Sequence, residues 1–81
     1  MPTVLRSGPY RLYFYSHEPN EPPHVHVDRY DQSAKFWIDP VALAVNFGFS
    51  RVELGRVEAT VIVNQATLLE AWHEFFGTTS G

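Results

Sequence analysis

The chain has 81 residues, a length that suits one small domain, and its net charge of −3 includes only six basic residues, which are scattered. Nucleic-acid binding usually leaves a cluster of Lys and Arg, so we expect no nucleic acid as a direct partner. Because the chain has no cysteine, neither a disulfide framework nor a thiolate metal site stabilises the fold, and a core must come from its 44% apolar and 15% aromatic residues.

The sequence shows neither of two common targeting patterns. The N-terminal stretch MPTVLRSGPYRLYFY does not join a basic region to a long apolar run, so we expect no signal peptide. No run approaches the roughly 18 to 20 apolar residues that span a bilayer. We therefore expect a soluble, cytoplasmic protein with a single domain over residues 1–81, a core over about residues 3–76 and a frayed tail at residues 77–81.

The first half of the chain predicts four strands. TVLR at residues 3–6 is short and apolar, and turn residues separate it from the aromatic stretch YRLYFYSH at residues 10–17. Three prolines prevent a strand or a helix in EPNEPP at residues 18–23. HVHVDRY at residues 24–30 and AKFWID at residues 34–39 alternate apolar and polar side chains, and the short connection between them predicts a hairpin.

The second half predicts helices after an ambiguous stretch. VALAVNFGF at residues 41–49 fits either a short helical turn or an extended segment. Ser50 and Glu53 match an S-x-x-E capping box, which predicts that a helix begins there. QATLLEAWHEFF at residues 65–76 has the i, i+3, i+4 apolar spacing of a second helix, and Gly77 is placed to cap its end.

Strands followed by helices predict an α+β fold. In this fold a small antiparallel sheet of about four strands, from the N-terminal half, packs on one or two C-terminal helices. Val61, Ile62 and Val63 cannot all face one core if their segment is helical. The apolar surface that this leaves exposed favours a homodimer.

Alternate residues of a strand point to opposite faces of a sheet, and three strands divide their side chains in the same way. The apolar set comprises Leu12, Phe14, Val25, Val27, Phe36 and Ile38. The opposite face then carries Arg11, Tyr13, Tyr15, His17, His24, His26, Asp28, Lys35 and Trp37. This agreement across strands, together with the content of tyrosine, tryptophan and histidine, predicts a binding face, whereas the alternative is a face that is only solvated.

The spacing of His24, His26 and Asp28 is also that of a candidate metal site. H-x-H on a strand aims two imidazoles at one point, and Asp28 or His17 would complete a three-ligand set for zinc or another divalent metal. Such a site would suit a hydrolase or nuclease that activates water, with Lys35 or a nearby arginine, Arg11, stabilising negative charge. H-x-H alone is a weak motif, so the sequence establishes no cofactor.

Several segments in order resemble a family of small prokaryotic proteins, the domain of unknown function 4160. They are EPPHVHV at residues 21–27, AKFWIDP at residues 34–40, GFSRVEL at residues 48–54 and LLEAWHEFF at residues 68–76. The resemblance implies no catalytic residues, because the family has no established activity. It implies a context instead, since members often look like one half of a two-gene cassette of toxin–antitoxin type.

These observations favour a non-enzymatic interaction module that binds a small protein encoded nearby. The alternative is a small metal-dependent hydrolase or nuclease that uses the His-x-His-x-Asp strand. Pro22 and Pro23 hold the chain extended before this strand. We expect His24 and His26 to project away from the core, so that replacing both with alanine leaves the fold intact.

Their expected neighbours come from the strands on both sides. In the hairpin, Lys35 and Trp37 would lie next to the two histidines. On the preceding strand, Tyr13 or Tyr15 would complete the contact. The predicted site is therefore a band of rings and charges across the middle of the sheet.

Overall fold

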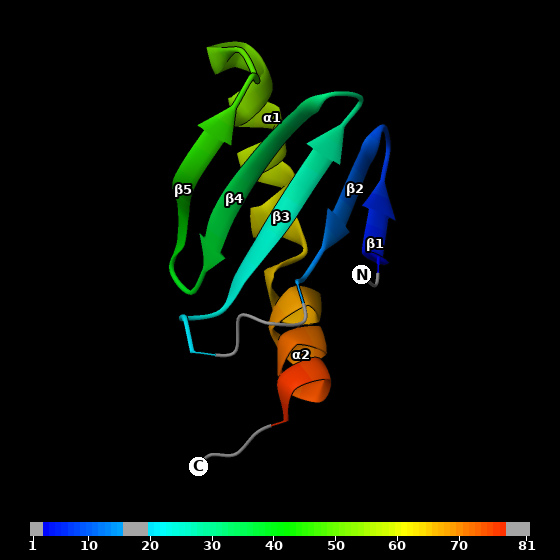
Figure 1. Cartoon of the computed structure of the whole chain (residues 1–81), viewed down its shortest axis with the longest axis vertical. Helices are drawn as coiled ribbons and strands as arrows, with labels where there is room; N and C mark the ends of the chain where they lie inside the picture. The colour runs from blue at the N-terminus through cyan, green and yellow to red at the C-terminus, as the bar shows by residue number, and fades with distance from the viewer. Residues whose placement is uncertain (1–2, 16–19, 78–81) are drawn as a thin grey trace.

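A computed structural model of the chain describes residues 3–15 and 20–77, in which five strands are followed by two helices (Figure 1). The elements are β1 (Thr3–Ser7), β2 (Tyr10–Tyr13), β3 (His24–Arg29), β4 (Gln32–Ile38), β5 (Val41–Phe47), α1 (Arg51–Val63) and α2 (Gln65–Phe76). This order confirms the predicted α+β class. Gly77 follows α2 as its cap, and the rest of the expected tail, residues 78–81, lies outside the described residues. No helix of the described chain is both long and apolar enough to cross a membrane.

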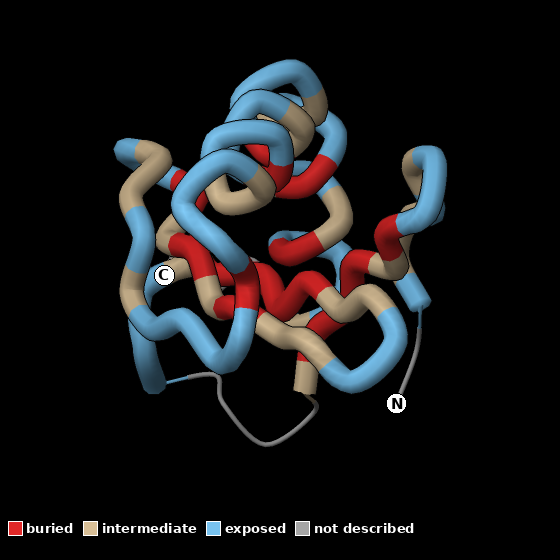
Figure 2. The backbone as a smooth tube through the Cα atoms, turned by 90° about the horizontal axis from the view of Figure 1, so that it is seen from above, coloured by how far each residue is buried: buried red, intermediate tan, exposed pale blue. Residues whose placement is uncertain are grey.

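The sheet is an antiparallel meander, with the strands side by side in the order β1-β2-β3-β4-β5. The predicted hairpin is formed by β3 and β4, and its turn uses Tyr30 at a φ of 54°. Within the hairpin, Val25 lies opposite Phe36 and Val27 lies opposite Ala34. In the view of Figure 1, α1 lies behind the sheet and α2 continues below its end, and in Figure 2 the helical layer lies on one side of the sheet. The other side of the sheet is therefore left without a helix.

The fifth strand is the segment that the sequence left ambiguous. β5 pairs with β4 from Ile38 opposite Val41 up to Ser33 opposite Phe47. The register shifts once along this pair. Lys35 lies opposite Val45 and the next residue, Phe36, lies opposite Leu43, so Ala44 has no partner on β4 and forms a β-bulge. A bulge interrupts the two-residue alternation on which strand prediction depends. The sheet therefore has five strands where the sequence predicted about four.

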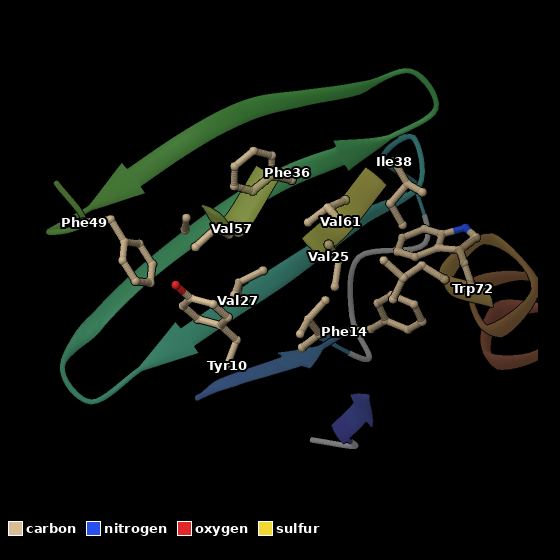
Figure 3. Packing of buried hydrophobic residues seen from close by; sticks show 13 residues of the cluster. Tyr10, Phe14, Val25, Val27, Phe36, Ile38, Phe49, Val57, Val61 and Trp72 are labelled. Atoms are coloured by element: carbon tan, nitrogen blue, oxygen red, sulfur yellow. The ribbon is translucent and has the colours of Figure 1, made fainter. Parts of the chain in front are cut away.

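The core fills the space between the helices and the covered face of the sheet (Figure 3). The predicted apolar set is confirmed, because each of its members is at most 1% exposed: Leu12, Phe14, Val25, Val27, Phe36 and Ile38. The helices contribute Val57, Val61, Leu68 and Trp72. The ring of Trp72 meets that of Phe14 edge to face, with centroids 5.2 Å apart. This contact joins α2 to the strand side of the core.

The start of α1 is held by a cap and by a polar cluster. The backbone N–H of Glu53 donates to Ser50 Oγ at 3.1 Å, which confirms the predicted N-cap. The Glu53 carboxylate does not return to the cap, as a full capping box requires, because it accepts hydrogen bonds from Arg29 and from the Tyr10 hydroxyl. The hydrogen bond from Arg29, followed by that from Tyr10, lowers the pKa of Glu53 below its ordinary value. The cluster ties α1 to β2 and β3.

The end of α1 provides a matched test of the core. Val61 is fully buried, whereas Val63 is 81% exposed, which agrees with the expectation that the three consecutive apolar residues cannot share one core. Both changes to alanine remove the same atoms from the same helix. We expect Val61→Ala to cost about 2 kcal/mol and to lower the Tm by roughly 8 to 16 °C. Thermal denaturation should show a change of no more than a few degrees for Val63→Ala, and equal losses for the two variants would contradict this placement of α1.

Candidate functional site

The sheet face opposite the helices, which we call the outer face, gathers side chains from three neighbouring strands. The register places His26 between Tyr13 of β2 and Lys35 of β4, and it places His24 opposite Trp37. These are the neighbours that the alternation in the sequence predicts. His17, which was also assigned to this face, lies outside the described residues.

Five rings form a continuous band on this face, which we call the aromatic band: Tyr13, Tyr15, His24, His26 and Trp37. The His26 ring stacks on Tyr13 at a centroid distance of 5.4 Å and meets Tyr15 edge to face at 4.3 Å. The His24 ring follows at 5.2 Å from His26 and 5.8 Å from Trp37. The band arises because side chains at every second position of adjacent strands lie beside one another.

Both histidines are buried, which corrects the expectation that they project away from the core. His24 is 0% exposed, although it was expected to project away from the core. Its Nδ1 donates a hydrogen bond of 2.9 Å to the carbonyl oxygen of Pro22, and its ring centroid is 5.0 Å from that of Trp72 in the core. His24 is the first residue of β3, and its contact with Trp72 joins this end of the strand to α2. His26 is 9% exposed, and its ring contacts both tyrosines of the band.

The charged residues beside the aromatic band are paired with neighbours. Asp28 accepts a hydrogen bond of 3.0 Å from the Tyr13 hydroxyl, and its second oxygen is 3.9 Å from an Arg11 nitrogen. The Arg11 guanidinium also lies over the Tyr13 ring, 4.6 Å from its centroid. Lys35 lies over Trp37 at 4.8 Å and donates to Glu21 at 2.5 Å. These pairs leave little net charge at the centre of the face.

Glu21 is the residue of this face that sequence reasoning missed. It belongs to the proline-containing connection before β3, where no periodicity assigns side chains to a face. The only signal was its position three residues before His24, to which its carboxylate oxygen comes within 3.9 Å. Its pairing with Lys35 joins the connection to β4.

The described part of the chain contains no group of three or more His, Asp or Glu side chains arranged to hold a metal ion. His24 and His26 lie close together, but Asp28 is held two residues further along by Tyr13 and Arg11. The structure thus brings no third ligand to the two histidines among the residues it describes.

A hollow of about 300 Å³ lies away from this face, between β1 and α2. Its walls are Thr3, Val4, Phe14, Ala71, Glu74 and Phe75. None of the aromatic band contributes to it. The hollow has one carboxylate and no histidine, so it does not offer the paired groups that acid–base or metal chemistry requires.

The burial of His24 predicts a structural role that an alanine substitution will expose. His24→Ala removes the ring between Trp37 and Trp72 and leaves the Pro22 carbonyl without its donor. We expect a loss of about 2 to 4 kcal/mol in the free energy of unfolding. Urea denaturation measures it, with His73→Ala on the exposed side of α2 as the control. A stability equal to that of the control would mean that the His24 ring does not contribute to the core.

The Tyr13 hydroxyl predicts a loss of stability at alkaline pH. Burial, followed by hydrogen bonds with Tyr15 and Asp28, raises the pKa of Tyr13 above its ordinary value near 10. A tyrosine with a raised pKa in the folded state stabilises the fold below the pKa of the unfolded chain, and that contribution is lost as the pH rises through the folded pKa. We expect the Tm to fall above about pH 10, and to fall less steeply in Tyr13→Phe. Parallel curves for the two proteins would contradict this.

Comparison with known proteins identifies a family but no relative of established function. Searches of curated proteins and of solved structures gave no match. One family matches residues 10–73, a segment that runs from the start of β2 to the last turn of α2 and includes every described residue of the aromatic band. Because this match covers more than half of the 81 residues, the chain belongs to the family described as Domain of unknown function (DUF4160).

Proposed function

We propose that the protein is a cytoplasmic, non-enzymatic interaction module that binds a small protein encoded beside it, as one member of a toxin–antitoxin-like two-gene cassette. The observation that supports this proposal is the aromatic band on the outer face, in which Tyr15 and Trp37 are partly exposed. The two-gene context is what the family resemblance implies. The partner is a protein because the face is rich in rings and its charges are paired.

The rings of the band differ in exposure, and a partner would touch the exposed ones. Tyr13, His24 and His26 are buried, whereas Tyr15 and Trp37, which contact them, are partly exposed. The buried rings hold the exposed rings in position, so little side-chain entropy remains to be lost on binding. Tyrosine and tryptophan held in this way are the residues that most often dominate protein interfaces.

The charged pairs set the specificity that such an interface would have. Lys35 and Arg11 flank the band, each partly exposed and each in contact with a carboxylate of the same chain. The carboxylates of an acidic partner would replace Glu21 or Asp28 as the ion-pair partners of Lys35 and Arg11. The number of ion pairs would then change little. A phosphate-rich partner would gain less beside the band, because Arg11 and Lys35 are already paired with carboxylates of the same chain.

The metal-dependent hydrolase or nuclease has less support, because the described residues supply two histidines without a third ligand. Metal analysis of protein purified without a histidine tag tests it. Stoichiometric zinc or manganese, together with hydrolysis that a chelator abolishes, would favour this alternative over the interaction module.

The leading proposal is tested by co-expression with the adjacent small gene, followed by pull-down and titration of the purified pair. We expect a complex whose affinity falls at least about 30-fold in Trp37→Ala, the loss expected of an aromatic residue central to an interface. Phe75→Ala is the matched control, because Phe75 is an exposed ring on α2 and not on the outer face.

A second variant separates binding from folding. Tyr15→Ala should also weaken the complex, and circular dichroism should show that both outer-face variants remain folded. The absence of any complex, or equal affinities for Trp37→Ala and Phe75→Ala, would refute the proposed role of the band.

A further inference from the structure

The strand at one end of the sheet has a free edge. β5 is last in the order β1-β2-β3-β4-β5, and among the described residues no further strand pairs with it. On an edge strand about half of the backbone N–H and C=O groups point away from the sheet and remain available to another strand. Helix α1 packs behind β5 and β4 and leaves this edge open.

The side chains of β5 make this edge unusually apolar. Its sequence, VALAVNF, contains no charged residue and no proline, which are the two common protections of an edge strand. Leu43, Val45 and Phe47 are exposed, with Phe47 at 64%. Because of the bulge at Ala44, Leu43 shares the helix side with its partner on β4, whereas Val45 and Phe47 share the outer side with theirs. The edge therefore offers apolar surface on both sides of the sheet.

The charges of the two ends of the sheet indicate what can occupy this edge. At the opposite end, β1 carries an exposed Arg6, which lies opposite Arg11 of β2. Pairing β5 of one copy with β1 of the next would leave a free edge at both ends and continue without limit. Pairing β5 with β5 closes after two copies. It also brings no like charges together within the strands, although each chain carries a net charge of −3.

We propose that two copies of the chain pair through β5, antiparallel about a twofold axis, and join their five-stranded sheets into one sheet of ten. The apolar side chains of each β5 cover those of the other on both sides of the sheet. The two outer faces then lie on one continuous surface, each with its own aromatic band. This inference stands independently of the proposed function, because it uses a different surface.

The proposed contact between the two β5 strands is short, so we expect a weak dimer. Seven residues of strand span about 24 Å. Strand pairing of this length, with three exposed apolar side chains on each copy, buries less than the roughly 1,600 Å² of a standard stable interface. The dimer should therefore dissociate on dilution, from twice 9.3 kDa towards the monomer mass.

Light scattering on the full chain over a range of concentrations tests the association. We expect Val45→Glu to remain monomeric where the unmodified chain is dimeric, because it places a carboxylate from each copy within the apolar contact between the two strands. Within its own sheet the new carboxylate faces Lys35, so the monomer keeps a favourable neighbour. Val63→Glu is the control, since it adds the same charge at an exposed apolar site on α1. A chain that stays monomeric at every concentration, or a dimer that Val63→Glu disrupts and Val45→Glu does not, would overturn the proposal.

Disulfide scanning tests the geometry even if a charged variant fails to fold. The chain has no cysteine, so single substitutions Ala42→Cys, Leu43→Cys, Ala44→Cys and Val45→Cys each introduce one thiol. In an antiparallel twofold pair only positions near the axis meet their own copy within the Cα distance that a disulfide needs, about 4.4 to 6.8 Å. Mild oxidation should therefore cross-link one or two adjacent positions strongly and the others weakly. Uniform cross-linking along the strand, or stronger cross-linking in Val63→Cys, would overturn the proposal.

Discussion

The antiparallel register of β3 against β2 and β4 is the constraint on which both faces of the sheet depend. Once Val25 lies opposite Phe36, the pleat turns Val25 and Val27 towards the helices and turns His24 and His26 the other way. The same pairing aligns Tyr13 with His26 and Trp37 with His24. The core and the aromatic band are thus two products of one register, and a shift by one residue would exchange them.

The alternation in the sequence was enough to predict the faces of three strands, because each of these strands is regular over the residues concerned. It was not enough for β5, where the bulge at Ala44 places Leu43 and Val45 on opposite sides although they are two residues apart. Likewise, the capping box located the start of α1 but could not show that Glu53 binds Arg29. That partner is 24 residues earlier in the chain, and local patterns carry no information about it.

His24 shows the same limit at the candidate site. Its neighbours on the sheet follow from the register, but its burial follows from Trp72, which belongs to the last helix. The alternation of side chains within β3 gives no information about a contact with a residue of α2. As a result, the residue that seemed most available for chemistry is the one through which the aromatic band meets the core. A rearrangement of Trp37 would therefore also displace Trp72 on α2, since tightly packed rings do not move independently.

The bulge at Ala44 also affects how related sequences should be aligned. Inside a regular strand, losing one residue turns every following side chain to the other face, so gaps are rarely accepted there. Ala44 can be lost without turning the following side chains to the other face, because it has no partner on β4. The residues on either side of it, Leu43 and Val45, already lie opposite the consecutive residues Phe36 and Lys35. A homologue that is one residue shorter in the middle of this strand would keep every pairing on both sides of the gap. The natural place for length variation in this half of the sheet is therefore within a strand and not only in its loops.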